Sequence, residues 1–409
     1  MRLIHTSDWH LGRPLLNRKR YEEFEQFLDW LAETIVAERV DVLLVAGDVF
    51  NNSVPSNRAQ ELYYRFLKRV ADSACHHVVI VAGNHDSPSF LDAPRELLRI
   101  LDVHVVGAAT SSPDDEVLVL EGKDGGPGLI VCAVPYLRDR DVRTVDAGES
   151  LVDKDRKQAE GIRDHYLRVA TIAEETRSAL GGGIPIVAMG HLFVAGGKTV
   201  EEDGVRDLYV GSLAKVGGDA FPPFLDYLAL GHLHVPQMVN DAETRRYSGS
   251  PLPMGFGEGG HKPEVLLVEF SGTTAEVTPI SVPRFRELES IRGDWKMISA
   301  QLTDLKAKES DAWIEVVYDG ADVIGNLQGL VEEAVAGTSM ELLRVRDSRL
   351  SADVLERMGH AEMLEDLGEE EVFKRLLTSK EVPEAQREEL LMSYRDVVRE
   401  LHEEDANAK

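Results

Sequence analysis

The sequence has little cysteine, no long apolar run and no surplus of positive charge. Its two cysteines, Cys75 and Cys132, form no C-x-x-C pair and are too few for a disulfide framework, which indicates a reducing compartment. No apolar run reaches the roughly 18 to 20 residues of a membrane span, and the opening MRLIHTSDWH has no signal-like apolar region. We therefore expect a cytoplasmic protein that neither enters nor crosses a membrane.

The scarcity of positive charge limits the ways in which the chain can bind nucleic acid. Its 45 Lys and Arg residues face 72 Asp and Glu residues, for a formal net charge of −27. Such a charge opposes non-specific attraction to a polyanion. The acidic excess is uneven, because residues 351–409 hold 8 basic and 17 acidic side chains. Any nucleic-acid site must therefore be local and assisted by metal ions.

The composition and patterning indicate a soluble globular chain of several units. With 409 residues, 43% of them hydrophobic and 29% charged, the chain is longer than one core usually serves. Residues 1–280 alternate strands with helices and then become rich in strands. Residues 281–350 form a small β-α-β-α-β pattern, and residues 351–409 show only helical patterns. We predict three domains with these boundaries.

Residues with metal-binding chemistry follow five of the expected strands, which span 2–6, 42–46, 78–82, 184–189 and 227–230. Open α/β sheets place ligands at the carboxyl ends of their strands. One Asp or His in such a place is usually a turn residue or a helix cap, but five such strand ends indicate one shared site. The residues concerned are Asp8, His10, Asp48, Asn84, His85, Asp86, His191, His232 and His234.

The types of donor atom predict which metals bind and how many. Gly47, Gly83, Gly190 and Gly231 precede these ligands and are expected to let the chain turn sharply. Carboxylate, imidazole and amide donors without a thiolate suit Mn²⁺, Fe²⁺ or Zn²⁺ better than Ca²⁺, and seven donors are too many for one ion. Two ions about 3.5 to 4 Å apart can clamp a phosphoryl group and activate a water molecule. The pattern predicts phosphoester hydrolysis.

The order of the motifs adds a resemblance to a known family. D-x-H, GD, GNHD, GH and GHLH resemble the calcineurin-like metallophosphoesterase superfamily. HTSDWHLG, VAGDVF, AGNHDS, ALGHLH and SGSPLPMGF resemble, more narrowly, the SbcD family of nuclease subunits. The resemblance implies an α/β fold with a two-sheet β-sandwich core flanked by helices. It also implies a small α+β domain that caps the site, and C-terminal helices.

The resemblance also assigns a role to each site residue. It implies one metal ion held by Asp8, His10 and His234, a second held by Asn84, His191 and His232, and Asp48 as the bridge. His85 would be the catalytic acid that stabilises the departing 3′-oxygen, with a structural histidine as the alternative. Many relatives have an acid or histidine at the position of Asn51. The side chain of Asn51, or that of Asn52, would orient His85, and Asp86 would support it.

Three further features allow a functional and a structural interpretation. Arg13, Arg18, Lys19 and Arg20 either contact DNA phosphates or form a solvated basic loop. The stripe Leu62, Tyr63, Phe66 and Val70 either packs in the core or, as the resemblance implies, joins a homodimer interface. The helical stripes around Phe373 and Leu391 would, by resemblance, bind an SbcC-like ATPase at the base of its coiled coil.

Together these observations favour one function and leave two alternatives. The resemblance implies a Mn²⁺-dependent DNA exonuclease and endonuclease that cuts double-strand ends and hairpins. It would act with an SMC-type ATPase in DNA repair and recombination. One alternative is a phosphatase or small phosphodiesterase of the same superfamily, which would not need the residues beyond 280. The other is a non-catalytic DNA-binding subunit that uses its metal ions as structural staples.

Overall fold

The computed structural model describes residues 1–143, 150–194, 216–322, 324–348 and 391. It divides into two compact units, Met1–Val345 and Arg346–Lys409. The predicted helical stripe around Phe373, the rest of the stripe that includes Leu391 and the strand expected at 208–210 lie outside the described residues. The division into three domains at 280 and 350 stays a prediction.

Two six-stranded sheets form the sandwich that the sequence predicts. The first sheet has the order β12-β11-β1-β2-β3-β4, in which β1 to β4 are parallel and β11 runs antiparallel to β1. The second has the order β5-β6-β7-β8-β10-β9, in which β6, β7, β8 and β10 are parallel. The strands of the first sheet are β1 Arg2–Thr6, β2 Val42–Ala46, β3 His77–Val81, β4 Val103–Val106, β11 Glu264–Ser271 and β12 Thr274–Ser281. Those of the second are β5 Val117–Glu121, β6 Pro127–Ala133, β7 Ile186–His191, β8 Tyr227–Gly231, β9 Gln237–Val239 and β10 Ala242–Tyr247.

The interior between the sheets is apolar and fully buried. Leu44 and Val79 of the first sheet pack in one cluster with Val131, Met189 and Ala229 of the second, and all five are 0% exposed. Burial stabilises such side chains by about 25 cal/mol for each Å² removed from water. Because the central strands are covered on both faces, they appear in the sequence as continuous apolar runs.

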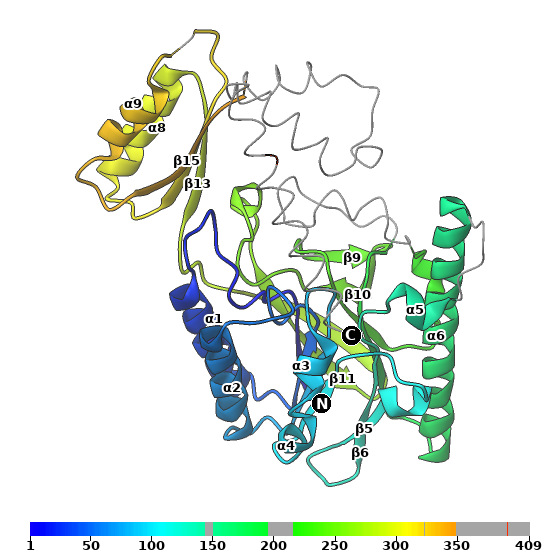
Figure 1. Ribbon diagram of the computed structural model, residues 1–409. Coiled ribbons are helices and arrows are strands. Elements are labelled where there is room, and N and C mark those ends of the chain that lie inside the picture. Colours follow the sequence, from blue (N-terminus) through cyan, green and yellow to red (C-terminus); the bar gives the residue numbers. More distant parts are fainter. Residues whose placement is uncertain (144–149, 195–215, 323, 349–390, 392–409) are drawn as a thin grey trace. The chain divides into compact units, whose positions relative to one another are not determined.

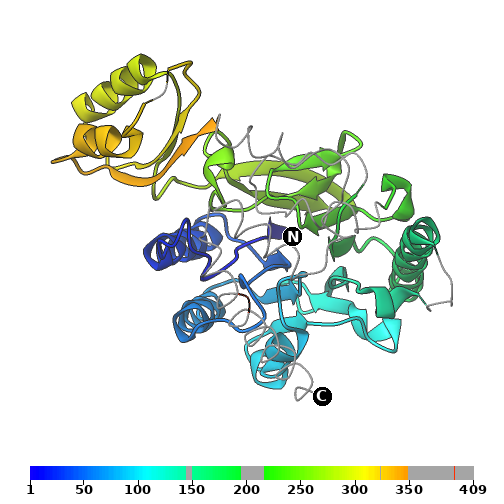
Figure 2. The ribbon, with the colours of Figure 1, turned by 45° about the horizontal axis from the view of Figure 1, so that its top comes forward.

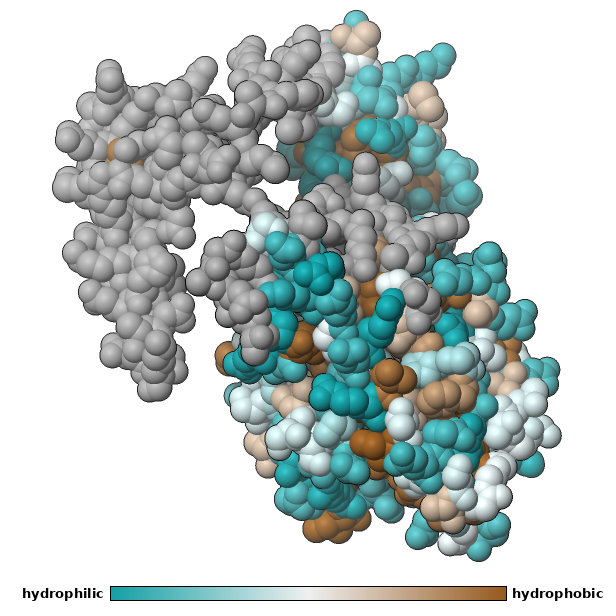
Figure 3. All heavy atoms as spheres, turned by 90° about the vertical axis from the view of Figure 1, so that its right-hand side faces the viewer, coloured by the Kyte–Doolittle hydropathy of each residue, from teal (hydrophilic) through white to brown (hydrophobic). Residues whose placement is uncertain are grey.

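Helices cover the outer faces of the sandwich. In two views α1 and α2 lie side by side on one side and α6 lies on the other (Figure 1, Figure 2). The face that includes α6 is mostly hydrophilic, with hydrophobic side chains scattered over it (Figure 3). The helices of this part are α1 Tyr21–Ala37, α2 Asn57–Ala71, α3 Pro88–Asp92, α4 Arg95–Arg99, α5 Asp139–Val142 and α6 Leu151–Ala179, with short 3₁₀ turns at Pro113–Glu116, Gly218–Ala220 and Phe256–Glu258. The described residues contain no helix long and apolar enough to span a membrane.

The apolar stripe of α2 belongs to the core rather than to the surface. Leu62, Tyr63, Phe66 and Val70 are at most 3% exposed, and they pack in the same cluster as Phe27 of α1. Ser56 begins this helix by accepting the N–H of Ala59 on its side-chain oxygen. Of the two interpretations of this stripe, core packing is therefore correct, because these side chains are covered within one chain.

A small β-α-β-α-β unit follows, as the sequence predicts. It consists of β13 Leu288–Gly293, α8 Trp295–Ala307, β14 Trp313–Tyr318, α9 Leu327–Val335 and β15 Glu341–Asp347. Its own core includes Ile298 and Val316. Leu288 and Trp313 also pack with Leu15 and Phe256 of the sandwich, so the small sheet contacts the loop that follows the first metal-binding motif.

Candidate metal centre

All the predicted ligands meet at one edge of the sandwich, beyond the carboxyl ends of five parallel strands. β1 leads to Asp8 and His10, and β2 leads to Asp48. Asn84 follows β3, and His191 is the last residue of β7. His232 and His234 follow β8. Parallel strands end at the same edge, so loops far apart in the sequence converge there. The carboxylate and histidine ligands are buried, with at most 6% exposed, whereas Asn84 and His85 are half-buried.

Several ligands hold an unusual backbone conformation. Asp8, His10, Asp48 and His232 have φ values of 53°, 48°, 49° and 101°, in a region that residues other than glycine seldom adopt. The N–H of Asp8 bonds to Gly47 O at 3.0 Å and that of His10 to Asp48 O at 2.9 Å. Such conformations cost about 1 to 3 kcal/mol each, and they persist where the surroundings enforce them, typically at functional sites.

The four glycines before the ligands act in two different ways. Only Gly47 has a positive φ, of 89°, so the prediction of a sharp glycine turn is wrong for the other three. A Cβ on Gly83 would lie 2.1 Å from Asp48 Oδ1, one on Gly190 2.0 Å from the Tyr166 hydroxyl, and one on Gly231 2.0 Å from Ala46 O. These three positions need glycine because a side chain or the main chain of a neighbouring element approaches too closely for a Cβ.

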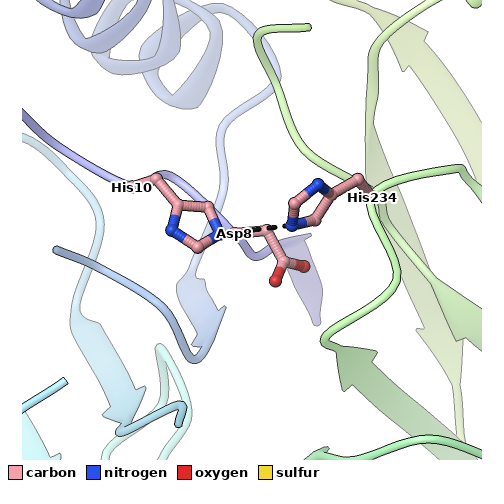
Figure 4. Close-up of side chains that lie close together, drawn as sticks. All are labelled: Asp8, His10 and His234. Carbon is pink, nitrogen blue, oxygen red and sulfur yellow. Dashed lines mark hydrogen bonds between the residues drawn. The ribbon is translucent and has the colours of Figure 1, made fainter. Parts of the chain in front are cut away.

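The first group of ligands is Asp8, His10 and His234, whose ligand atoms lie within 4.8 Å of one another. Figure 4 shows one ring nitrogen of His10 pointing toward one of His234, beside the Asp8 carboxylate. His10 Nε2 lies 3.2 Å from His234 Nε2. Two imidazole nitrogens this close need a proton or a metal ion between them, so the arrangement fits a cation.

A second group contains Asp8, Asp48 and His191 and meets the same distance limit. His191 Nε2 lies 3.0 Å from Asn84 Oδ1 and 3.3 Å from Asp48 Oδ2. His232 Nδ1 lies 3.1 Å from the same Asn84 oxygen. Asp48 Oδ2 is also 3.5 Å from His10 Nε2, so this carboxylate stands between the two groups.

Hydrogen bonds to the far side of two rings fix which nitrogen faces the centre. His191 donates its Nδ1–H to Ala46 O at 2.9 Å, and His234 donates its Nδ1–H to Glu258 Oε1 at 3.2 Å. A metal-binding histidine typically has such a partner, which leaves the Nε2 lone pair for the ion. Sequence reasoning missed Glu258, which is 4% exposed and whose other oxygen accepts the N–H of Met254. The only signal for it was its place just after the SGSPLPMGF motif.

The charges in the centre suit metal ligands. Burial lowers the pKa of His10 well below its usual value and that of His232 to about 3, so both rings are neutral. Burial opposes ionisation of Asp48, but the charge of His191 outweighs it and holds the Asp48 pKa well below its usual value. The charge of Asp48 in turn outweighs burial at His191 and raises its pKa to about 9, and a bound ion would replace that proton. Burial raises the pKa of Asp8, and a cation would offset that effect.

The centre also leaves two buried ring nitrogens without a hydrogen bond. Among the described residues, His10 Nδ1 and His232 Nε2 have no partner. Buried polar atoms are normally satisfied, so each unpaired atom needs an explanation such as an ion or a water molecule. These two atoms are not the ring nitrogens that face the other ligands, so the facing Nε2 atoms of His10 and His234 are the observation that fits a divalent metal ion.

The ring of His85 makes its hydrogen bond to the main chain and not to a neighbouring side chain. Its Nδ1–H donates to the main-chain oxygen of Asn51 at 3.0 Å, and its own N–H donates to Asp48 Oδ1 at 2.8 Å. Of the two candidates, Asn51 rather than Asn52 supplies the contact, but the expectation of a side-chain amide is wrong. The ring packs edge-on against His10, with the ring centroids 4.9 Å apart. Its catalytic role stays a prediction.

Asp86 and two serines support the loops that present the ligands. Asp86 is 2% exposed and accepts the N–H groups of Gly83, Val49 and Phe50, so it ties the loop after β2 to the loop after β3. Burial raises its pKa to about 7. Sequence reasoning missed the serines. Ser7 donates to Asp8 Oδ2 at 2.5 Å, and Ser250 donates to Asp8 O at 3.0 Å.

The four predicted DNA-contacting residues divide into two classes. Arg20 is 3% exposed and is bound by Glu23 at 2.8 Å and by Pro253 O at 2.6 Å, so the prediction is wrong for this residue, which is part of the core. Arg18 is exposed and pairs with Glu341 of the small sheet at 3.0 Å. Arg13 is half-buried near His10, and Lys19 is exposed. These last three stay candidates.

Comparisons with known proteins place the sequence in a family. A family model described as calcineurin-like phosphoesterase matches residues 1–236, and one described as type 5 capsule protein repressor C-terminal domain matches residues 284–381. The SbcD subunit of the SbcCD nuclease from Escherichia coli (strain K12) is 36% identical over 393 residues, which are 95% of this chain and 96% of that one.

Two further proteins of the same name and one solved structure are also similar. The protein of Rhodobacter capsulatus is 37% identical over 71% of each chain, and that of Bacillus subtilis is 34% identical over 66% of each. The crystal structure of a dimetal phosphatase from Danio rerio covers 69% of this chain and 99% of its own, at 13% identity and a TM-score of 0.37.

Proposed function

Because the chain belongs to the SbcD family of calcineurin-like phosphoesterases, we propose that it is the nuclease subunit of an SbcCD-type complex and uses two divalent metal ions. The observation that carries the two-ion part is the position of Asp48. Its Oδ2 lies 3.5 Å from His10 Nε2 in one ligand group and 3.3 Å from His191 Nε2 in the other. A carboxylate in this place fits a bridge between two ions.

The chemistry of the donors favours Mn²⁺. Carboxylate, imidazole and amide ligands without thiolate suit a borderline divalent ion. Bound there, two such ions would polarise the phosphate and acidify the attacking water molecule. The chain's own contribution is to keep the His10 and His232 rings neutral by burial and the Asp48 carboxylate ionised beside His191.

His85 is the proposed proton donor to the departing 3′-oxygen. His85 is half-buried, whereas the carboxylate and histidine ligands around it are buried. A substrate can therefore reach the His85 ring. Its Nδ1–H is engaged by Asn51 O, which holds the ring in place and leaves Nε2 for the substrate. A ring held this way can donate a proton from Nε2 when it is protonated.

The proposed substrates are double-strand ends and hairpins of DNA, cut both from the end and internally. Arg13, Arg18 and Lys19, in the loop that follows His10, would supply positive charge for backbone phosphates in an acidic chain. The small sheet packs against the same loop through Trp313 and Leu15, which supports its proposed role as the cap that selects substrate shape. We extend the proposal to action in DNA repair and recombination in the cytoplasm.

The proposed protein partners are an SbcC-like SMC-type ATPase, bound through the C-terminal helices, and a second copy of this chain. Apart from Leu391, the residues of the ATPase contact lie outside the described ranges, so that proposal depends on the family relationship. The stripe of α2 is buried in the core, so a homodimer that uses this helix would need its other face. That face has charged residues, including Arg65 and Arg69, which pair with Glu25 and Asp29 of α1.

A cleavage assay tests the proposed function. The purified chain with Mn²⁺ would be given a labelled hairpin duplex and, separately, a small phosphodiester. We expect wild type to cut the duplex, Asp48→Asn to lose both activities, and His85→Ala to lose cleavage but keep bound Mn²⁺. His76→Ala is the matched control, because His76 is exposed and is not one of the centre's ligands.

The alternatives predict different results in the same assay. Hydrolysis of the small ester without cleavage of DNA would identify a phosphatase or small phosphodiesterase. DNA binding without hydrolysis of either substrate would identify a non-catalytic subunit. Absence of metal-dependent DNA cleavage, with and without an ATPase partner, would overturn the nuclease proposal.

A further inference from the structure

A second cluster of metal-binding side chains lies at the opposite edge of the first sheet. It consists of His77, which begins β3, Asp102, which precedes β4, and His104 in β4. Their ligand atoms all lie within 4.8 Å of one another. Because β3 and β4 are parallel, this cluster is at their amino ends, whereas the metal centre is beyond the carboxyl ends. The two groups share no residue.

The strand register places the two histidines on one face. His104 is paired with Val79, which is two residues beyond His77, and side chains two residues apart point to the same side of a strand. That side faces the second sheet, because Val79 packs in the cluster between the sheets. The two rings lie 6.2 Å apart between centroids. Both histidines therefore sit at the end of the sandwich interior, where water and ions have access.

One nitrogen of His77 is already prepared as a ligand. Its Nε2 lies 3.1 Å from the main-chain oxygen of Glu121, at the end of β5 in the second sheet. A carbonyl oxygen only accepts, so Nε2 carries the hydrogen and Nδ1 carries the lone pair. Nδ1 is buried and has no hydrogen-bond partner among the described residues. Metal-binding histidines have this arrangement, with one nitrogen bonded to a carbonyl and the other free for the ion.

The carboxylate completes the set from the adjoining turn. Asp102 is exposed, so its side chain can rotate without displacing a neighbour. Its main-chain oxygen accepts the N–H of Val78 at 3.0 Å, which fixes the backbone from which the side chain extends. Ligands about 2.1 Å from a tetrahedral ion lie about 3.4 Å from one another, so only small side-chain rotations are needed.

We propose that His77, Asp102 and His104 bind one divalent transition-metal ion, Zn²⁺ before others, at a site separate from the metal centre. Two imidazoles and one carboxylate are a typical ligand set for Zn²⁺ and leave a fourth position for water. The ion would clamp the edge strand β4 to β3, and through the Glu121 carbonyl it would hold the second sheet as well. An ion that binds only the folded chain raises its stability.

Counting bound zinc tests the proposal on the full chain. Wild type and His104→Gln would be dialysed against the same low-micromolar Zn²⁺ concentration, and bound metal would be measured by mass spectrometry. We expect His104→Gln to bind about one equivalent less than wild type, with the metal centre still loaded. His76→Gln is the matched control, because this exposed neighbour is outside the cluster, and it should bind as much as wild type.

A second variant and a direct observation keep the test independent of folding and of nuclease activity. Asp102→Asn changes one exposed side chain, keeps its size and should also reduce the bound zinc. Anomalous diffraction at the zinc edge should place a peak between His77 and His104. Equal zinc in wild type, His104→Gln and Asp102→Asn, or an equal loss in His76→Gln, would overturn the proposal whatever the nuclease assay shows.

Discussion

The two edges of the first sheet are built differently, although both gather histidine and aspartate. At the carboxyl edge, ligands such as Asp8 and Asp48 have left-handed backbones, and a Cβ on Gly83 would collide with Asp48. At the amino edge, His77 and His104 are ordinary strand residues, and only one ring nitrogen is fixed by a hydrogen bond. The first edge is preorganised by several left-handed ligands and by close packing, whereas at the second edge only Asp102, with φ 54°, has a left-handed backbone.

This difference explains why only one edge is visible in the sequence. Strained ligands at strand ends need particular neighbours, so each appears as a short motif with glycine beside it, as in the GD of Gly47 and Asp48. The amino-edge cluster joins His77 to His104 through strand register alone, with no motif between them. Preorganisation of the carboxyl edge should make it far more sensitive to small substitutions.

The largest expected effect comes from adding one methyl group at the carboxyl edge. In Gly83→Ala the new Cβ would lie 2.1 Å from Asp48 Oδ1, so the loops after β2 and β3 must separate. A displacement of about 1 Å can reduce turnover roughly a hundredfold, and we expect at least that loss in the DNA cleavage assay. The comparison of the two edges fails if Gly83→Ala retains wild-type turnover.

The matched control for this substitution is Gly260→Ala. Gly260 is exposed and has no positive φ, and a Cβ added to it would have no atom within 4 Å. Turnover of this variant should equal that of wild type, because the methyl group enters open space. A large loss in the control as well would mean that glycine content, rather than packing against Asp48, sets the sensitivity.

A smaller effect is expected from the support behind one ligand ring. Glu258 accepts the Nδ1–H of His234, and partners of this kind change metal affinity by roughly 10- to 100-fold. We expect Glu258→Ala to weaken Mn²⁺ binding most and Glu258→Gln, which keeps an acceptor without the charge, to fall between. Titration calorimetry with Mn²⁺ gives the order. Equal affinities in wild type and both variants would contradict this role.

The sequence predicted the ligands because they stand next to the strands that present them. The strand at 42–46 was also predicted with its observed bounds, since all five of its residues are apolar. Glu258 reaches His234 from a separate loop, so neither the type of residue nor its spacing reveals the contact. The 29-residue helix α6 was missed, although Ile162, Tyr166 and Val169 have helical spacing.

His5, which is buried in the interior between the two edges, should make the free energy of unfolding depend on pH. Burial lowers the pKa of His5 from 6.5 to about 3, and the neutral ring bonds to the Tyr227 hydroxyl and to Leu230 O. In the unfolded chain His5 takes up a proton below about pH 6.5, whereas in the folded chain it stays neutral down to about pH 3. His5 therefore lowers the free energy of unfolding as the pH falls through this window, by about 1.4 kcal/mol per pH unit.

Urea unfolding of His5→Gln in chelator measures this contribution. As the pH is lowered from about 6.5 to 5, the unfolding free energy of the variant should fall less steeply than that of wild type. The reason is that the variant takes up about one proton fewer on unfolding. His10 and His232 are also kept neutral by burial, so the difference between the two slopes, and not either slope alone, reports His5. Parallel curves would show that His5 is not the group that takes up the proton on unfolding.

The smallest effect at the carboxyl edge is expected at Asn51. Its main-chain oxygen, and not its side chain, accepts the Nδ1–H of His85, and every residue type supplies that oxygen. Asn51→Ala should therefore keep turnover within about twofold of wild type from pH 6 to 8, whereas His85→Ala should lose it. A tenfold loss, or an altered pH profile, in Asn51→Ala would show that the side chain acts on the ring. The preorganisation of this edge would then depend on the side chain of Asn51 as well as on the close-packed glycines and the partners of the ligands.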